Sequence, residues 1–407
     1  MYLLFVFLGW LSIYAATFSD TEYEVFDLST KYGKQMIWIL LSFVLIIIIL
    51  AIDKKFYEQF SGIFYLASII SLVGLFIFGN NINGATSWYS FGSFGIQPSE
   101  FAKAATSLAI ANYLNERNQD LRKLSNQLKA FAIIFIPAFL ITLLPDPGSA
   151  LVYVSLILVL YRFGLPLYYL IIGFLGLLLF VITLYFGFLT TLTIALVTIS
   201  IFFGYLIYKN KNYFRYNWLR FALIYLFTGL FIVSVDYVFN NVFEQRHRDR
   251  FNILLGKDVD DQGIGYNTAQ SVITIGSGGI TGKGFLQGDR TQGDFVPEQQ
   301  TDYIFSTVGE GWGFLGSGCV IFLLVAFLIR LLYIADRQKS VFSQVYAYAT
   351  VAIFFFHFTI NIGMVIGLLP TIGIPLPFFS YGGSSLWGFT VLLFIMIRLD
   401  ADRIYEW

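Results

Sequence analysis

The chain has 407 residues, of which 57% are hydrophobic and 12% are charged, and its formal net charge at pH 7 is zero. A soluble domain carries about 25% charged residues, so this composition excludes an ordinary soluble protein and indicates a polytopic membrane protein. The lack of net positive charge excludes a broadly basic nucleic-acid-binding protein. One cysteine excludes an internal disulfide, and two histidines are too few for a convincing histidine-based metal cluster.

Apolar segments suited to crossing a membrane follow one another along most of the chain. A bilayer core needs about 20 mostly apolar residues per helix, and on this basis the sequence predicts twelve spans. In chain order they lie near 2–17, 36–52, 62–79, 98–114, 130–144, 149–163, 167–185, 188–207, 221–240, 306–329, 342–368 and 378–398. The boundary near 186 is the weakest, and ten or eleven spans would follow if one apolar run is re-entrant.

Lysine and arginine residues support this topology. If the N-terminus lies inside, the short outer loops receive only Lys31 and Lys34, whereas the inner loops receive Lys54, Lys55, Arg117, Arg122, Lys123, Lys129, Arg162, Lys209, Lys211, Arg215, Arg220, Arg330, Arg337, Lys339, Arg398 and Arg403. Because cytoplasmic loops hold the excess of positive residues, we expect both termini to be cytoplasmic and the long polar loop 241–305 to be extracytoplasmic. We expect a single membrane domain over 1–407 that contains this loop. The first span lacks the positive region of a signal peptide, so we expect it to be retained.

Charged residues at the outer ends of spans are candidates for a functional site, because charge near hydrocarbon is costly. Glu100 and Lys103 stand three residues apart at the start of a span, so they share a helix face and can pair. A structural ion pair and a positive charge offered to a buried anion are both compatible with this spacing. Asp146 lies in a short turn next to Pro145, which explains the turn but not the carboxylate at membrane depth.

The long loop contains a glycine-rich stretch and closes on the segment 296–305. The glycines at 276–284 favour backbone amides that line an anion site. This stretch does not match a nucleotide-binding P-loop, because Ser277 replaces its first glycine and Gly284 replaces its serine or threonine. The acidic run 258–261 lacks the last glutamate of a calcium loop. Asp302 stands where the loop meets the next span, which makes it a functional candidate.

The segment from Asn361 to Ser385 contains prolines and repeated glycines that exclude one straight helix. Irregular backbone at this depth is tolerated only where it is buried in protein or lines a cavity. The sequence therefore predicts a cavity wall or a re-entrant segment here.

Together these segments resemble the RodA/FtsW family of shape, elongation, division and sporulation (SEDS) proteins. The resemblance rests on the order and spacing of Asn83-Gly84 with Trp88, Gln97-Pro-Ser-Glu100 with Lys103, Pro145-Asp146, Gln245-Arg246, Gly263 to Tyr266, Gln270-Ser271, Gly276-Ser-Gly-Gly279, Pro297-Glu298 with Thr301-Asp302, and Gly367 to Ser385. The form of residues 373–378 and the very short N-terminus are more similar to the RodA branch than to the FtsW branch.

The chain also departs from the family pattern. Thr86 and Ser87 stand where members usually have arginine, and Asp260-Asp261 replaces an Asp-Pro dipeptide. Members commonly have ten spans, so we expect one extra helix pair between about 167 and 240.

The resemblance implies an all-α polytopic protein of the bacterial inner membrane that acts as a peptidoglycan glycosyltransferase on lipid II. It implies a role in cell wall biogenesis, cell elongation and shape, and a class B penicillin-binding protein as partner. By similarity the catalytic aspartate is Asp302. Further candidates for binding the substrate or lining the cavity are Glu100, Lys103, Asp146, Arg246, Arg248, Lys283, Glu298 and Ser384. The metal requirement is unknown, and a divalent cation, magnesium or manganese, stays open.

Two other functions fit the same sequence. A lipid II flippase would also have many spans, broken helices and charges within the membrane. It should carry polar groups along both halves of its path, whereas the candidates here gather at the outer ends of spans. A non-catalytic scaffold for the cell-wall machinery is the third interpretation.

Overall fold

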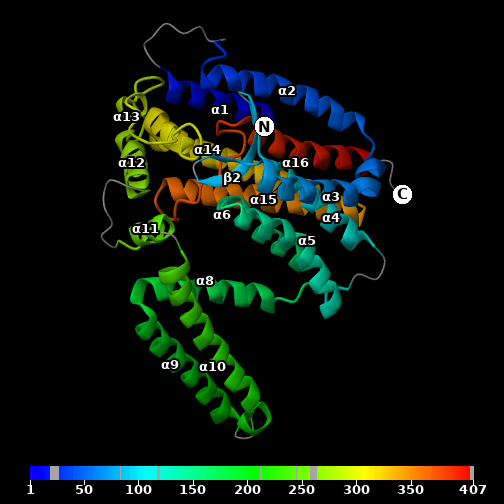
Figure 1. Cartoon of the computed structure of the whole chain (residues 1–407), viewed down its shortest axis with the longest axis vertical. Coiled ribbons are helices and arrows are strands. Elements are labelled where there is room, and N and C mark those ends of the chain that lie inside the picture. The colour runs from blue at the N-terminus through cyan, green and yellow to red at the C-terminus, as the bar shows by residue number, and fades with distance from the viewer. Residues whose placement is uncertain are drawn as a thin grey trace. The chain divides into compact units, whose positions relative to one another are not determined.

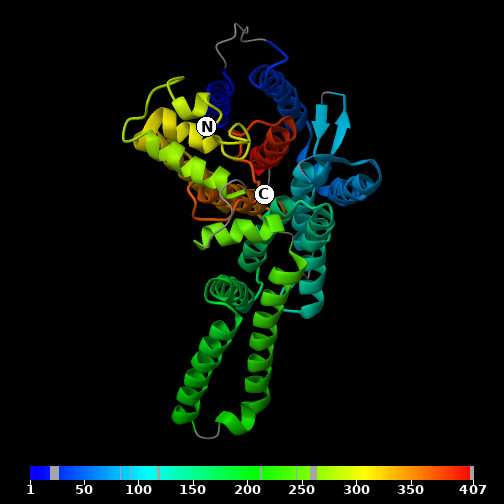
Figure 2. The ribbon, with the colours of Figure 1, turned by 60° about the vertical axis from the view of Figure 1, so that its left-hand side comes forward.

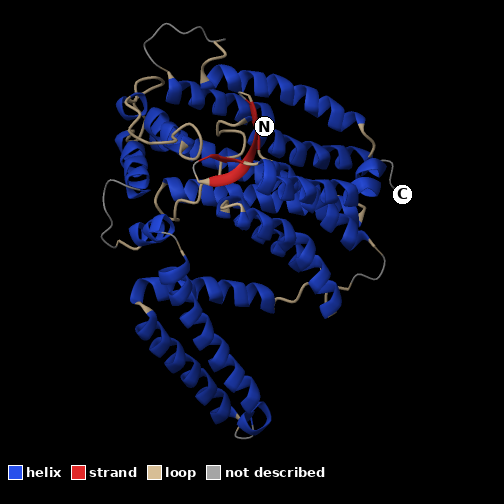
Figure 3. Ribbon diagram, in the orientation of Figure 1, coloured by secondary structure: helices blue, strands red, loops and turns tan. Residues whose placement is uncertain are grey.

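The computed structural model describes residues 1–18, 27–82, 84–92, 94–116, 120–210, 213–243, 245–256 and 264–403. Asn83, Gly263 and the acidic run 258–261 therefore lie outside the described residues. Within the described part of the chain nearly all regular structure is helical, as Figure 3 shows. The chain divides into two compact units, Met1–Pro166 with Tyr266–Trp407, and Leu167–Gly265. The predicted domain boundaries stay a prediction.

The first unit begins with helices that are joined by short turns and one small sheet. The elements are α1 (Tyr2–Thr17), α2 (Lys31–Ala51), α3 (Lys54–Phe78), β1 (Asn80–Ile82), β2 (Ala85–Phe91), β3 (Phe94–Ile96), α4 (Pro98–Asn115), α5 (Leu124–Leu143), α6 (Pro147–Leu151), the 3-10 helix η1 (Val152–Ser155) and α7 (Leu156–Arg162). The three strands form an antiparallel sheet in the order β1-β2-β3, with Asn80 opposite Trp88 and Tyr89 opposite Ile96. This sheet connects α3 to α4 (Figure 1).

The first unit resumes after the second unit with α12 and continues to the C-terminal helix. Its elements are α12 (Ile264–Ser277), α13 (Asp289–Gln292), α14 (Ile304–Asp336), α15 (Val341–Val365) and α16 (Gly383–Asp402). Helix α14 is broken at Gly313, where φ is 65° and ψ is −161°. A Cβ at Gly313 would lie 2.2 Å from the Gly282 nitrogen, so only glycine fits this close approach. Residues 279–284 hydrogen-bond to the backbone at the break, as in Phe314 N to Gly279 O at 2.9 Å.

The second unit consists of α8 (Tyr168–Phe186), α9 (Phe188–Lys209), α10 (Tyr213–Tyr237), the π-helix η2 (Val238–Val242) and α11 (Gln245–Leu254). Helices α9 and α10 lie side by side in both Figure 1 and Figure 2. A small core of Leu184, Val235 and Phe239 joins α8, α10 and η2. Many leucine, isoleucine and phenylalanine side chains of α8 to α10 are exposed, as expected for helices surrounded by lipid.

The predicted all-α polytopic fold is confirmed, and each of the twelve predicted spans coincides with helical chain. Among the described residues, nine helices are long and apolar enough to cross a membrane, and Tyr2–Thr17 and Pro147–Arg162 are shorter apolar helices. Helix α4 matches the remaining predicted span. Prediction and structure differ at the last span, because residues 368–376 have no regular structure and α16 starts only at Gly383. The prolines at 370, 375 and 377 explain this late start.

Helix α4 is the most enclosed part of the first unit, because α3, α5, α15 and α16 all pack against it. Its buried residues include Ala102, Ala104, Ala105 and Ala111. Small residues allow helix backbones to approach closely within a membrane. The charged residues of its first turns therefore lie in the interior of the unit.

Candidate active site

The loop that ends at Asp302 is fastened to the irregular segment between α15 and α16. The Ser380 hydroxyl donates to the Thr301 carbonyl at 2.6 Å, and the Tyr381 N–H donates to the Gln300 carbonyl at 2.8 Å. The Asn361 amide donates to the Asp302 carbonyl at 2.8 Å. These bonds fix the backbone at Asp302 and at the two residues before it.

Gly373, in the irregular segment, lies directly beside the Asp302 carboxylate. A Cβ on Gly373 would stand 3.3 Å from Asp302 Oδ2, and its φ of 76° favours glycine. From the other side, a Cβ on Gly148 would stand 2.7 Å from the Ile372 carbonyl oxygen. The turn that carries Asp146 and the loop that carries Asp302 thus pack against neighbouring residues of one segment.

Asp146 caps α6 and belongs to a small polar network. Its Oδ1 accepts from the Ser149 N–H at 3.1 Å, and its Oδ2 accepts from the Gln97 amide at 3.0 Å. The Gln97 N–H donates to the Ser384 hydroxyl oxygen at 3.1 Å, and this hydroxyl donates to the Gly95 carbonyl at 3.0 Å. The structure therefore brings together Asp146 and Ser384, which the sequence analysis named separately.

Glu100 and Lys103 form the predicted ion pair, with 2.8 Å between Lys103 Nζ and Glu100 Oε2. Their side chains are only 2% and 1% exposed. Lys103 Nζ also hydrogen-bonds to His357 Nε2 at 3.0 Å and lies 4.8 Å from the centre of the Phe389 ring. Sequence analysis missed His357, because a histidine 254 positions away from its partner gives no local signal.

Glu298 lies in the same tight loop as Asp302. Its carbonyl accepts from the Thr301 N–H at 3.1 Å and from the Tyr303 N–H at 3.4 Å. Its carboxylate accepts from the Thr301 hydroxyl at 3.1 Å. Glu298 has φ of 56°, which is uncommon for a residue with a side chain and often accompanies function.

Lys283 belongs to a second charged cluster, around the buried carboxylate of Glu310. Lys283 Nζ lies 2.7 Å from Glu310 Oε1 and 3.1 Å from Asp289 Oδ2. Glu310 also accepts bonds from the Ser277 hydroxyl, from the backbone N–H of Arg290, and from the N–H and hydroxyl of Thr291. The hydrogen bond to Glu310 raises the pKa of the Lys283 ammonium above its ordinary value. Its charge is thus matched within the protein.

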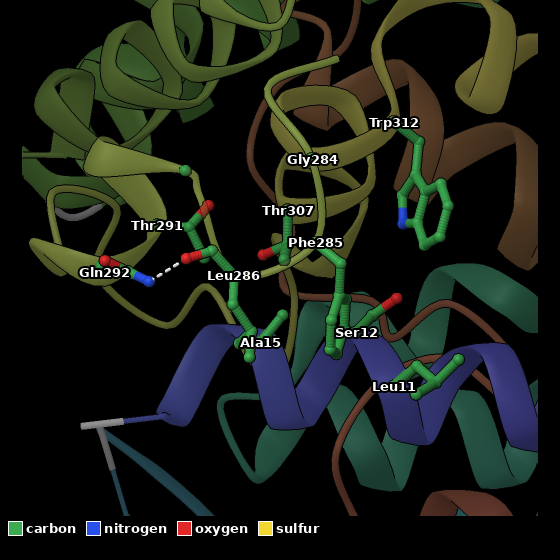
Figure 4. Close-up of a pocket in the computed structure, with 12 residues that line it drawn as sticks. Leu11, Ser12, Ala15, Gly284, Phe285, Leu286, Thr291, Gln292, Thr307 and Trp312 are labelled. Carbon is green, nitrogen blue, oxygen red and sulfur yellow. Dashed lines mark hydrogen bonds between the residues drawn. The ribbon is translucent and has the colours of Figure 1, made fainter. Parts of the chain in front are cut away.

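A small cavity lies next to this cluster (Figure 4). Its volume is about 20 Å³, and its lining residues are Leu11, Ser12, Ala15, Gly284, Phe285, Leu286, Gly288, Thr291, Gln292, Thr307, Gly311 and Trp312. Such a volume holds about one water molecule, so it excludes a sugar.

The two candidate arginines belong to the second unit. Arg248 Nη1 donates to the Asn240 carbonyl at 3.0 Å within that unit. The side chain of Arg246 lies outside the described residues.

A larger apolar groove of about 490 Å³ runs between α2, α3, α4 and α16. It is lined by Ile49, Ile52, Tyr57, Phe64, Ala67, Ser68, Ser71, Tyr89, Ile96, Pro98, Phe101, Ala104, Ala105, Leu108, Val391 and Ile395. Ile96 and Pro98 flank Gln97, so the groove meets the polar network of Asp146 at the start of α4.

Comparison with known proteins decides the family. The model of the FtsW, RodA and SpoVE cell cycle proteins matches residues 1–207 and 214–405. The chain belongs to this family. A peptidoglycan glycosyltransferase RodA from Treponema pallidum (strain Nichols) is 32% identical over 98% of this chain and 95% of its own length. The peptidoglycan glycosyltransferase MrdB of Escherichia coli (strain K12) is also 32% identical, over 92% of this chain and 86% of its own length.

Solved structures of this family share the fold. A chain from a peptidoglycan synthase complex that coordinates polymerization and crosslinking superposes with a TM-score of 0.67, at 21% identity, covering 100% of this chain and 97% of that one. The rod shape determining protein RodA of Thermus thermophilus gives a TM-score of 0.61 at 19% identity, covering 100% of this chain and 95% of that one.

Protein side chains alone could form a metal site only if at least three suitable ligands lay close together. Among the described residues no three His, Cys, Asp or Glu side chains are grouped so that they could hold a metal ion. Magnesium is often held instead by one or two carboxylates together with substrate phosphates. Asp302 and Glu298, which share one tight loop, would be the carboxylates to hold such an ion together with the substrate. The divalent cation stays a prediction.

Proposed function

We propose that this peptidoglycan glycosyltransferase polymerises lipid II into glycan strands, with Asp302 as its general base. The observation that carries the assignment is the placement of Asp302. Its backbone is held by Asn361, its carboxylate lies against Gly373, and it stands where the long loop enters α14. A base needs such a fixed position, because a small displacement of the reacting groups costs much of the rate.

The proposed reaction joins the 4-hydroxyl of a GlcNAc to the anomeric carbon of a MurNAc that carries a polyprenyl pyrophosphate. The new bond forms between O4 and C1, and the bond between C1 and the phosphate oxygen breaks. The hydroxyl proton passes to the Asp302 carboxylate, and the bonding electrons leave with the pyrophosphate. A sugar hydroxyl is a weak nucleophile, so a positioned base contributes about 10²- to 10⁴-fold to the rate.

The departing pyrophosphate gains negative charge, which cations placed in advance would stabilise. Lys103, Arg246, Arg248 and Lys283 are the proposed candidates. Their surroundings differ, since Lys103 is enclosed with Glu100 and Lys283 is paired with Glu310 and Asp289. A substrate phosphate would have to compete with these carboxylates. When bound, a divalent cation would supply further positive charge, and no step above depends on it.

The apolar groove supports a lipid-linked substrate. Its volume of about 490 Å³ and its mostly hydrocarbon lining suit part of an isoprenoid chain. Since Ile96 and Pro98 line it beside Gln97, a tail in the groove would bring its pyrophosphate end toward the network of Asp146. A substrate that remains in the bilayer explains why a glycosyltransferase is built from membrane helices.

The chain is a multi-pass membrane protein, and its orientation is part of the proposal. The distribution of lysine and arginine favours cytoplasmic termini and an extracytoplasmic long loop. In this orientation the starts of α4, α6, α14 and α16 and the end of α15 all lie on the outer side. We also propose a class B penicillin-binding protein as partner, since one solved relative belongs to a complex that coordinates polymerization with crosslinking.

The deciding experiment compares Asp302→Asn with wild type, using labelled lipid II and purified protein in liposomes. We expect the variant to make no glycan strands, while its Tm and its binding to the partner stay unchanged. Asp294→Asn is the matched control, because Asp294 is an exposed carboxylate of the same loop with φ of 50°, which asparagine tolerates. Full-length strands from Asp302→Asn would disprove the assignment of the base.

The flippase interpretation is tested in the same liposomes. In the proposed orientation, the candidate residues of the first unit lie at the outer ends of helices or in the long loop, which does not provide the polar path through both leaflets that a flippase needs. We expect lipid II in the inner leaflet to stay protected from an added modifying enzyme when this protein is present. If the protein is only a scaffold, the wild type will make no glycan strands in this assay.

A further inference from the structure

Helix α15 presents two buried polar side chains, one turn apart, to the irregular segment that follows it. His357 Nδ1 lies 3.2 Å from the Pro375 carbonyl oxygen. The Asn361 amide donates to the Ile374 carbonyl at 2.7 Å and to the Asp302 carbonyl at 2.8 Å. His357 is 1% exposed and Asn361 is fully buried. Two consecutive carbonyls of a segment without regular structure are therefore held by one helix.

The contacts of His357 define which ring nitrogen carries the proton. The Lys103 ammonium has only donors, so His357 Nε2 accepts its hydrogen bond at 3.0 Å. The proton of the neutral imidazole then lies on Nδ1, which donates to the Pro375 carbonyl. A doubly protonated ring would have no acceptor for Lys103 and would repel it. His357 thus bridges α4 and the irregular segment as a neutral side chain.

The surroundings of this bridge are closed on every side. Glu100 and Lys103, both from α4, are the charged groups beside it. From α16 the Phe389 ring lies edge to face with His357, with 4.7 Å between the ring centres, and it also faces Lys103 Nζ. Lys103 therefore cannot move without disturbing the imidazole, and the imidazole cannot move without releasing Pro375.

We propose that His357 is a positioning residue for Asp302, an inference that rests on the proposed function. It fixes the carbonyl of Pro375, and through the neighbouring residues it fixes Gly373, where an added Cβ would stand 3.3 Å from the Asp302 carboxylate. The buried ion pair of α4 is thereby connected to the base across α15. If this contact is lost, residues 373–375 shift and the base moves away from the substrate hydroxyl. A displacement of about 1 Å can lower the rate about 100-fold.

The test compares two variants of almost equal shape, His357→Gln and His357→Met. Glutamine offers an acceptor for Lys103 and a donor for Pro375, whereas methionine offers no donor. Phe358→Leu is the packing control, because Phe358 is a buried neighbour on the same helix without a polar side chain. The measurements are kcat and KM for labelled lipid II in liposomes, and the Tm of each protein.

We expect His357→Met to lower kcat about 10- to 100-fold with an unchanged KM, and His357→Gln to retain kcat within about threefold of wild type. Phe358→Leu should lower Tm about as much as His357→Met does, but it should change kcat little. Equal kcat values for the Gln and Met variants, or a change confined to KM, would overturn the inference. If the Met variant does not fold, the pair His357→Asn and His357→Leu decides, because the Asn amide nitrogen stands where Nδ1 stands and can still donate to Pro375, whereas leucine has no donor. Asn should then retain more of kcat than Leu, and equal kcat values would overturn the inference.

Failure of the proposed function gives a different result. A wild-type protein that makes no strands from lipid II contradicts the glycosyltransferase activity itself. An active wild type together with a fully active His357→Met contradicts only the positioning role.

Discussion

Two lysine–glutamate pairs of the first unit have nearly the same geometry but different surroundings. Lys103 and Glu100 are 2.8 Å apart and almost fully buried, whereas Lys283 is 26% exposed and lies 2.7 Å from the buried Glu310. In the first pair the lysine has the additional partners. In the second pair the glutamate is the centre, with donors from Ser277, Arg290 and Thr291. When one member of a pair is replaced, the loss of unfolding free energy should depend on whether the other member stays buried. It should not depend on the distance between the two charges in the native pair.

The largest expected effect is that of Lys103→Ala. This substitution leaves the Glu100 carboxylate buried without its cation, which costs about 3 to 5 kcal/mol. The measurement is thermal unfolding of the purified protein in detergent, together with its rate of strand synthesis. Lys129→Ala is the control, since Lys129 is exposed on α5 and should change the unfolding free energy by less than about 0.5 kcal/mol.

A charge swap sharpens this result. Glu100→Lys combined with Lys103→Glu should restore part of the lost stability, because the two charges still face each other. Restoration should be incomplete, since a carboxylate at 103 would face His357 Nε2, which carries no proton in the native pair. Normal expression without any recovery in the double variant would contradict a mutual ion pair.

Glu310→Ala should cost less than Lys103→Ala. Lys283 keeps Asp289 and its contact with water, so no buried lysine is stranded. The donors of Thr291 and Ser277 lose their acceptor, which costs about 1 to 3 kcal/mol. Unfolding of both variants in the same detergent gives the comparison. Asp289→Ala is the matched control and should be nearly neutral, because that carboxylate is 87% exposed. A larger loss of unfolding free energy for Glu310→Ala than for Lys103→Ala would contradict the idea that water stabilises the lysine left behind.

The smallest expected effect is a pH dependence of the pair between the partly exposed Lys283 and the buried Glu310. The pKa of Lys283 is raised in the folded protein by its bond to Glu310. A raised lysine pKa contributes stability below the unfolded value of about 10.4, and this contribution is lost as pH rises through the folded pKa. The difference in Tm between wild type and Lys283→Met should therefore shrink between about pH 10 and pH 12. A constant difference over this range would argue against the ion pair.

Some of this site was predictable because its signals are local. The three-residue spacing of Glu100 and Lys103 predicted their pairing, and hydropathy predicted where the helices lie, apart from the late start of α16. The glycines and prolines between 361 and 385 predicted the irregular segment that now contacts Asp302. These features depend on neighbours in sequence, so a single chain is enough to detect them.

Other parts depend on contacts between distant residues. The partners of Glu310 lie 19 to 33 positions away, and nothing near Glu310 in the sequence indicates them. The same holds for His357 and Lys103. The sheet over 80–96 was also missed, although the Asn-Gly pair before β2 is a recognised hairpin signal. The positions of Arg246 and Arg248 relative to Asp302 depend on how the two units are placed, which local pattern does not reveal.

The contact between Lys103 and His357 spans 254 residues, and this separation sets an order of events during synthesis. Chain growth at about 5 to 20 residues per second leaves roughly 10 to 50 s between the appearance of these two side chains. During that interval Glu100 is the available partner for Lys103, since it lies within one helical turn and enters the membrane with it. The site is complete only after α15 has inserted, because His357 and Asn361 both lie on that helix.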